Sequence, residues 1–373
     1  MQTNVLTKTD SQEEQAGNAR HSVRLIDLID DMCAGKDIFF QSVRVVADVM
    51  TANPKTMTLD DKVEAALSFM KDNKIRHIPV VDVPEEGADP VFVGVLSGRD
   101  IGRHLSPYVG KIGQEDADRQ GLRDPLSQVI TRKPFSVSPE TGMTELLTIM
   151  IDHRVNMVPV LDGGDLVGVV TTADILGLFI RIHQIRQLCQ RDGESQRKMR
   201  LLDLTGKAKT EGVFYTSFKT VEDMMTENPV CLEEDDHLAT AVDVMQKSRF
   251  RHVPIIDENK RLKGLLSDRN VLRQLPGPRR DRTGQNADFR AGLFDVDLKD
   301  PRLTVPVRRI MMLDVPKSLP DYNIYDAAMR MQDTRTDALV ITDETEVVQG
   351  ILTVTDFMRA LLATYEFTAK QSS

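Results

Sequence analysis

Four segments of this chain repeat one frame of residues. In each copy a Met is followed nine positions later by Pro or Val, and three positions after that by Asp. A Gly comes next, with Ser or Thr three positions beyond it and Asp or Asn six positions beyond it. The frames run over 70–100, 150–174, 245–270 and 331–356. Only the distance between the Asp and the Gly varies, as expected of a turn. The chain is therefore predicted to be four copies of one structural unit.

Each copy is predicted to be a β-α-β-β-α unit. Apolar residues at helical spacing lead up to the Met, two short strands rich in β-branched residues follow, and a second helix begins where the frame ends. A unit of this size is too small to bury a core alone. We therefore expect copy one to pair with copy two and copy three with copy four, which gives an α/β (α+β) fold of two modules.

The frames divide the 373 residues into copies and connecting segments. We place an N-terminal tail at 1–44, copy one at 45–105, copy two at 125–180, a linker at 181–217, copy three at 218–275, a connector at 276–306 and copy four at 307–363. Residues 1–21 are polar and predicted to be disordered. The apolar spacing over 22–34 predicts a helix that docks on the copies or on a partner, and the stretch from Ile180 to Leu188 is also predicted to be helical.

Composition excludes several classes of protein. The net charge is −9, so the chain as a whole lacks the basic character of a nucleic-acid-binding protein. No apolar run reaches the roughly 20 residues of a membrane span, and the polar N-terminus resembles no targeting signal. The three cysteines are isolated, which favours a reducing cytoplasm over disulfides or a zinc site. We expect a cytoplasmic protein that contacts neither nucleic acid nor membrane.

A hydroxyl and a carboxylate recur where the last strand of each copy gives way to a helix. A helix start offers unpaired N–H groups that suit phosphate, and a carboxylate there can accept hydrogen bonds from ribose hydroxyls. The alternative is that these residues only cap the helix. The hydroxyl residues are Ser97, Thr171, Ser267 and Thr353, and their partners are Asp100, Asp174, Asn270 and Asp356.

Basic residues appear at the corresponding positions of alternate copies. Copies one and three carry an Arg-His pair before the first long strand and an Arg directly before the helix-start Asp or Asn, whereas copies two and four carry neither. The basic residues are Arg76, His77 and Arg99 in copy one, and Arg251, His252 and Arg269 in copy three. Guanidinium groups bind phosphate with two hydrogen bonds, which predicts anion binding. The alternative is ion pairing with nearby acids such as Asp72 or Asp100.

No set of catalytic residues competes with these binding features. We find no His, Cys and Asp cluster with metal-ligand spacing, no phosphate-binding P-loop and no nucleophile elbow. The chain is therefore predicted not to be an enzyme. The connector carries Arg279, Arg280 and Arg282, for which solvation and a phosphate or partner contact both stay open.

Four motifs recur in the copies and their lead-ins: Met50-Thr-Ala-Asn-Pro54, Met225-Thr-Glu-Asn-Pro229, Arg-His-Ile/Val-Pro and Gly-x-x-Ser/Thr-x-x-Asp. On these motifs the chain resembles the cystathionine-β-synthase (CBS) domain family. The resemblance covers about 45–180 and 218–363. It implies two Bateman modules that bind adenosine-containing ligands in clefts between paired repeats. A chain of four such repeats without a catalytic domain is similar to the gamma subunit of AMP-activated protein kinase.

The resemblance also implies roles for single residues. Asp100, Asp174 and Asp356 would hold ribose hydroxyls, the four hydroxyl residues would support ribose or phosphate, and the basic residues of copies one and three would bind phosphate. The segments 54–56, 134–136 and 229–231 would flank adenine. Asn270 replaces the acid in copy three, which implies weaker ribose binding there. Copy four has an irregular lead-in at 311–316 and no basic residue near its site, which implies a structural role.

The sequence thus predicts a non-catalytic sensor of AMP, ADP or ATP that reports its bound state to a protein partner. Alternatives are a sensor of S-adenosylmethionine or of a cyclic dinucleotide, and a docking scaffold that binds no nucleotide. A role for Mg²⁺ and homodimerisation are left open.

Overall fold

The computed structural model describes residues 43–84, 89–105, 109, 116–191, 218–275 and 296–371. The predicted disordered segment 1–21 and the predicted helix over 22–34 lie outside the described residues, as do 192–217 of the linker and 276–295 of the basic connector. The predicted helix over 180–188 forms part of a longer helix that begins in copy two.

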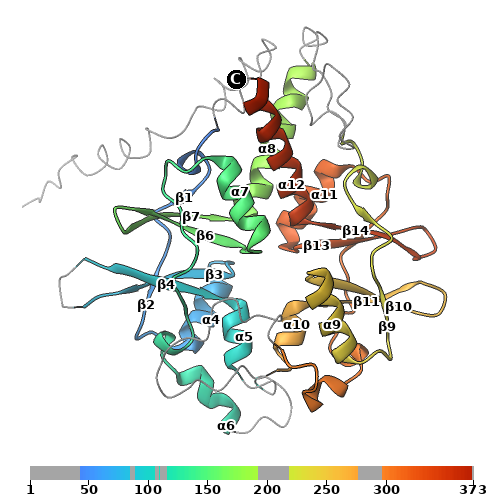
Figure 1. Ribbon diagram of the computed structural model, residues 1–373, viewed down its shortest axis with the longest axis horizontal. Helices are drawn as coiled ribbons and strands as arrows, with labels where there is room; N and C mark the ends of the chain where they lie inside the picture. Colours follow the sequence, from blue (N-terminus) through green and yellow to red (C-terminus); the bar gives the residue numbers. More distant parts are fainter. Residues whose placement is uncertain are drawn as a thin grey trace, which may run out of the picture.

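The predicted fold class and the predicted order of elements are confirmed (Figure 1). The left half holds copy one, with β2 (Met57–Thr58), α4 (Val63–Asp72), β3 (His77–Asp82), β4 (Val91–Ser97) and α5 (Gly98–His104). It also holds most of copy two, with α7 (Met143–Asp152), β6 (Met157–Asp162) and β7 (Asp165–Thr171), whereas α8 (Thr172–Arg191) of copy two runs up the middle of the view. The right half holds copy three, with β9 (Leu232–Glu233), α9 (Leu238–Ser248), β10 (His252–Ile256), β11 (Leu262–Ser267) and α10 (Asp268–Leu272), and copy four, with β12 (Lys317–Ser318), α11 (Ile324–Thr334), β13 (Ala338–Thr342), β14 (Val348–Thr353) and α12 (Val354–Gln371). In copy two the first strand is reduced to one bridge, between Val137 and Val160.

The segment that leads into each copy folds on the other copy of its module. Strand β1 (Thr51–Ala52) leads into copy one but pairs with β7 of copy two. Strand β5 (Thr131–Arg132) leads into copy two but pairs with β4 of copy one. In the second module β8 (Thr226–Glu227) pairs with β14, and Met312 bridges to Leu265. Each copy is therefore completed by a piece of its neighbour.

This exchange explains the Gly of the repeated frame. A Cβ atom added at Gly94 would lie 2.4 Å from the carbonyl oxygen of Thr131, on the crossing strand β5. At Gly168, Gly264 and Gly350 the same atom would lie 2.4–2.6 Å from the sulfur of a Met in the crossing lead-in. The frame needs Gly at this position because another backbone passes directly over it.

Copies two and four share one apolar core across the two modules. The core joins α7 and α8 to α11 and α12, which lie side by side in the upper part of Figure 1. At its centre the rings of Phe179 and Phe357 meet edge to face, with centroids 4.8 Å apart. We call this contact the apolar seam.

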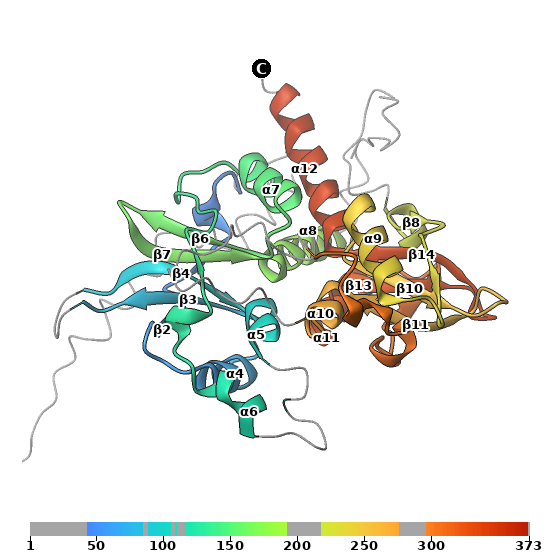
Figure 2. The ribbon, with the colours of Figure 1, turned by 60° about the horizontal axis from the view of Figure 1, so that its bottom comes forward.

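Copies one and three keep separate cores. They meet through the short helices α5 and α10, which lie together near the middle of Figure 2. Arg99 of α5 and Asp268 of α10 form an ion pair there, with 2.8 Å between Nε and Oδ2. We call this second contact the polar seam.

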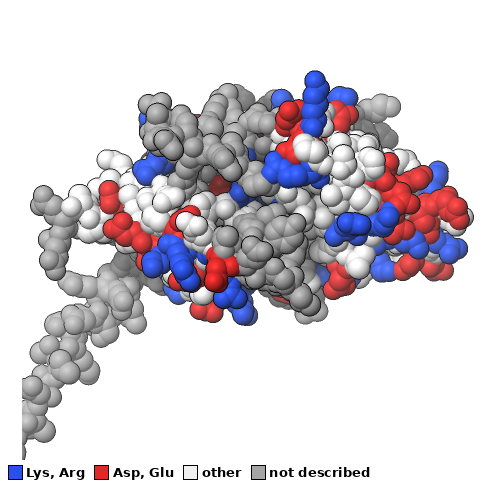
Figure 3. All heavy atoms as spheres, turned by 90° about the horizontal axis from the view of Figure 1, so that it is seen from below, with Lys and Arg blue, Asp and Glu red and all other residues white. Residues whose placement is uncertain are grey.

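Basic and acidic side chains of the described residues lie next to one another on the face shown in Figure 3. Among the described helices, none is both long enough and apolar enough to cross a membrane.

Candidate functional site

The helix-start carboxylates make the predicted caps. In copy one, Oδ2 of Asp100 accepts hydrogen bonds from the backbone N of Ser97 at 2.7 Å and from its Oγ at 2.5 Å, and the backbone N of Asp100 donates to that Oγ at 3.3 Å. Oδ2 of Asp174 and of Asp356 accept the same pair of bonds in copies two and four, at 2.6–2.7 Å. Capping uses one carboxylate oxygen, so it leaves the other for a second role.

The second oxygen faces a threonine from the other copy of the module. Oδ1 of Asp100 lies 3.4 Å from Oγ1 of Thr131, and Oδ1 of Asp174 lies 3.1 Å from Oγ1 of Thr51. Neither threonine was among the predicted site residues, although Thr51 belongs to a motif that carries the family resemblance. A carboxylate oxygen beside a hydroxyl can hold two adjacent hydroxyls of a sugar. Removal from water raises the pKa of Asp100, a cost that hydroxyl donors from a ligand would offset.

The site at the start of α10 in copy three lacks both the helix-start carboxylate and the threonine hydroxyl. Asn270 keeps the cap, since its Oδ1 accepts from the backbone N of Ser267 at 3.0 Å and also from the Oγ of that residue. The position of Thr131 is taken by Met312, which pairs with Leu265 in the register that Thr131 has with Val95. Because lead-ins cross between copies, Met311 and Met312 of the irregular segment 311–316 lie against β11 of copy three, whereas Pro316 at its end accepts a hydrogen bond from the backbone N of Val340 in copy four.

The copy-four site is more complete than the sequence suggested. Thr226 pairs with Ile351, in the register of Thr131 with Val95, so a threonine again accompanies the helix-start acid. The expectation of no basic residue near this site is wrong, since NH1 of Arg359 lies 3.8 Å from Oδ1 of Asp356. The comparison of the frames missed Arg359 because it lies three positions beyond the frame, at a place where copies one and three carry Arg103 and Arg273.

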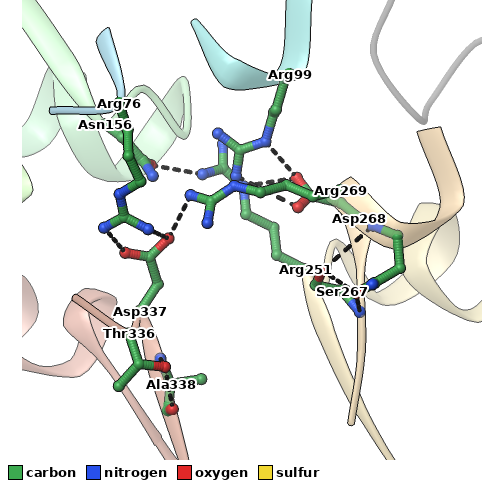
Figure 4. Close-up of polar contacts among 11 residues, drawn as sticks. Arg76, Arg99, Asn156, Arg251, Ser267, Asp268, Arg269, Thr336, Asp337 and Ala338 are labelled. Carbon is green, nitrogen blue, oxygen red and sulfur yellow. Dashed lines mark hydrogen bonds and ion pairs between the residues drawn. The ribbon is translucent and has the colours of Figure 1, made fainter. Parts of the chain in front are cut away.

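The arginines of copies one and three meet in one cluster between the modules (Figure 4). We call it the central cluster, and it consists of Arg76, Arg99, Arg251, Arg269, Asp268 and Asp337. NH2 and NH1 of Arg76 donate to the two carboxylate oxygens of Asp337 at 2.7 and 3.2 Å. NH2 of Arg269 donates to Oδ2 of Asp337 at 2.6 Å.

Asp268 holds the other two arginines. Nε of Arg99 donates to its Oδ2 at 2.8 Å, and Nε of Arg251 lies 3.9 Å from the same oxygen. NH1 of Arg251 also donates to Oδ1 of Asn156 in copy two, at 2.6 Å. Ion pairing, the alternative to anion binding, is therefore present, but the partners are not Asp72 or Asp100. The pair of Arg251 with Asp268 lies within copy three, whereas the pairs of Arg76, Arg99 and Arg269 join different copies.

The central cluster has more positive than negative charge. Removal from water and the neighbouring Arg99 lower the pKa of His77 to about 3, and removal from water lowers that of His252 to about 4, so both imidazoles are neutral at pH 7. Burial opposes ionisation of Asp337, but Arg269 and Arg76 outweigh it and lower the pKa of that carboxyl. Four guanidiniums thus face two carboxylates. Burial lowers the pKa of Arg251 to about 9, and the neighbouring Arg99 contributes to the same shift.

Two of the three segments predicted to flank adenine, 54–56 and 134–136, lie at the ends of the helices α4 and α7. The Phe135 ring stacks on His153 at the end of α7, with centroids 3.9 Å apart and planes 15° apart. At the corresponding place in copy one, Nζ of Lys55 donates to Oδ1 of Asn73 at 2.5 Å. Among the described residues, no group of three or more His, Cys, Asp or Glu side chains is arranged to hold a metal ion.

A family model agrees with the repeat pattern. The model described as "CBS domain" matches residues 46–106, 126–181, 221–277 and 307–363, which together make up more than half of the chain.

Individual relatives are more distant. The chain is 24% identical to the inosine-5'-monophosphate dehydrogenase of Methanocaldococcus jannaschii over 259 residues, a match that spans 68% of this chain and 42% of the dehydrogenase. It is 32% identical to the uncharacterised protein YlbB of Bacillus subtilis over 130 residues, which are 35% of this chain and 78% of that protein.

Among solved structures, protein MJ1225 of M. jannaschii, described as a candidate archaeal homolog of g-AMPK, has a TM-score of 0.51 and 18% identity. That match covers 85% of this chain and 99% of MJ1225, and it shows a common fold.

Proposed function

The chain belongs to the CBS domain family, and from that premise we propose that it is a non-catalytic regulatory protein that binds adenine nucleotides between paired repeats. The bound state would be transmitted to a protein partner. The observation that carries the proposal is the pairing of a helix-start carboxylate with a threonine from the other copy, which occurs at Asp100 and at Asp174.

The ribose of the nucleotide would bind at these pairs. A 2′,3′-diol has two adjacent donors, and the outward oxygen of Asp100 with the hydroxyl of Thr131 gives it two adjacent partners. Asp174 with Thr51 would act in the same way in copy two, and Asp356 with Thr226 in copy four. Asn270 and Met312 would make copy three the weakest site.

The phosphates would bind toward the central cluster. Arg99 directly precedes Asp100, and its guanidinium reaches the cluster, so one helix start connects the ribose position to the arginines. The phosphate-binding residues would be Arg76, His77 and Arg99 from copy one and Arg251, His252 and Arg269 from copy three. Their excess positive charge favours an anionic ligand.

Transmission would follow from the place of the cluster between the modules. A phosphate there would contact both modules, and AMP, ADP and ATP would differ in how strongly they favour one arrangement of the modules over another. The dehydrogenase match spans less than half of that enzyme, and we assign none of its chemistry to this chain.

Calorimetric titration of the purified full-length chain tests the proposal. The ligands are adenosine, AMP, ADP, ATP, S-adenosylmethionine and cyclic di-AMP, titrated into the wild type, Asp100→Asn and the control Asp162→Asn. Asp162 is exposed at the outer end of β6, so its replacement removes a carboxylate without touching a site.

We expect saturable binding of one or more adenine nucleotides, with the affinity of the copy-one site weakened about 10- to 100-fold by Asp100→Asn, since a hydrogen bond to a charged group contributes ~1.5–3 kcal/mol. Asp162→Asn should bind like the wild type. Absence of binding by every ligand would overturn the proposal and favour a docking scaffold. Binding of S-adenosylmethionine or cyclic di-AMP alone would keep the sites but change the ligand.

A further inference from the structure

We propose that the carboxylates of Asp337 and Asp268 are built-in substitutes for ligand phosphate, which an anionic ligand must displace from the arginines of the central cluster. This inference rests on the proposed function for the identity of the ligand, but it can be tested with an inorganic anion alone.

The geometry at Asp337 is that of a bound oxyanion. Its two carboxylate oxygens accept from both terminal nitrogens of Arg76, and one of them also accepts from Arg269 (Figure 4). Guanidinium groups make the same two-pronged contact with carboxylates and with phosphates. A phosphate that binds these donors therefore competes directly with Asp337.

Asp268 occupies the second pair of arginines in a similar way. Nε and NH2 of Arg99 donate to its two oxygens at 2.8 and 3.4 Å, and Arg251 approaches from the other side. Its side chain is 10% exposed, and that of Asp337 is 11% exposed. Carboxylates this deeply buried among arginines stay ionised, so they compete with a ligand across the physiological pH range.

The sequence positions support a specialised role for the acid in copy four. Asp337 occupies the place in its copy that Arg76, Asn156 and Arg251 occupy in the other three. One position of the repeat thus supplies two cations and one anion to the central cluster, and in copy two a neutral amide that contacts it. The amide of Asn156 already contacts NH1 of Arg251 at 2.6 Å, so copy two contacts the cluster without adding charge.

Both carboxylates connect the two modules. Asp337 of copy four binds Arg76 of copy one, and Asp268 of copy three binds Arg99 of copy one. When a phosphate replaces either carboxylate, an ion pair between the modules is exchanged for contacts to the ligand. Anion binding and the arrangement of the modules are therefore coupled.

Two substitutions change the competition in opposite directions. Asp337→Asn removes a built-in anion, and Asn156→Asp adds one at the equivalent position, against Arg251. Glu344→Gln is the matched control for Asp337→Asn, because Glu344 is exposed in the turn at the far end of β13 and its loss changes the net charge by the same amount.

The measurement is the binding of inorganic pyrophosphate to the full-length chain, by calorimetry and by the rise of the unfolding temperature, at an ionic strength held constant with NaCl. We expect Asp337→Asn to bind pyrophosphate about tenfold more tightly than Glu344→Gln, and Asn156→Asp about tenfold more weakly than the wild type, the size of one charge-assisted hydrogen bond.

Unchanged or weaker pyrophosphate binding by Asp337→Asn, or unchanged or tighter binding by Asn156→Asp, would overturn the inference. If Asp337→Asn does not fold, Asn156→Asp alone decides, since it adds an ion pair and removes none. The nucleotide titration tests the proposed function separately, so either proposal can fail while the other holds. Pyrophosphate binding that follows both substitutions without any nucleotide binding would remove the proposed ligand and keep the built-in anions.

Discussion

The incomplete site of copy three can be repaired with two substitutions. Asn270→Asp restores the carboxylate that copies one, two and four have at the helix start, and Met312→Thr restores the hydroxyl that Thr131 supplies to copy one. We expect the double variant to gain a nucleotide site that the wild type lacks or fills only weakly.

The structure sets the size of the effect. The carboxylate adds a charged acceptor worth ~1.5–3 kcal/mol per hydrogen bond, so the affinity at this site should rise about 10- to 100-fold. The cost in stability should be small. Asp100 makes the same cap that Asn270 makes, and Met312 is 37% exposed, so its shortening should cost less than about 1 kcal/mol.

Calorimetry with the nucleotide that binds the wild type measures the outcome. The stoichiometry of the double variant should rise by about one site. Asn270→Asp alone should recover part of the affinity, and Met312→Thr alone little, because the carboxylate provides the charged contact. A double variant that melts like the wild type but binds the same number of nucleotides would refute the ribose role of the carboxylate and threonine pair.

Three further results are expected. Gly94→Ala should lower the unfolding midpoint in urea more than Gly168→Ala does, since its Cβ meets a backbone oxygen and not a flexible Met side chain; equal effects would contradict the crossing of β5 over β4. Phe179→Ala should cost about 3–5 kcal/mol of unfolding free energy, measured by urea denaturation, and a cost below about 1 kcal/mol would contradict a tightly packed apolar seam. The stabilisation from neutral His77 and His252 should be complete above pH 6.5 and fall as the pH drops toward about 4, because the unfolded imidazoles take up protons that the folded ones do not. Urea titrations at a series of pH values should give an unfolding free energy that changes by up to about 1.4 kcal/mol per pH unit for each histidine, and by less in His252→Gln.

The sequence predicted the repeated unit because every residue of the frame has a local role. The Met lies in the buried face of the long helix, and the Ser or Thr and the Asp make one cap within three residues. Helical and strand periodicity report such local roles directly. The exchange of lead-ins was not predicted, because strands of two residues, such as β1 and β5, are too short to show a period.

The partners of the arginines were also missed, for a different reason. Asp72 and Asp100 were considered because they are close in sequence, whereas Asp337 lies 261 positions from Arg76. One clue was present, since Asp337 and Arg76 occupy the same place in their copies and carry opposite charge. A comparison of copies by position therefore indicates contacts at the centre that proximity along the chain does not.

The two seams between the modules differ in strength. Phe179 and Phe357 lie in a continuous core of copies two and four, and separating them would expose large apolar side chains at a cost of several kcal/mol. Copies one and three meet through ion pairs such as Arg99 with Asp268, whose partners can be exchanged for others of like charge. A phosphate that takes the place of Asp268 therefore acts on the polar seam, and one that takes the place of Asp337 breaks an ion pair between copies one and four. Neither exchange involves the apolar seam. We expect ligand binding to move copies one and three relative to each other, with α8 and α12 as the fixed axis.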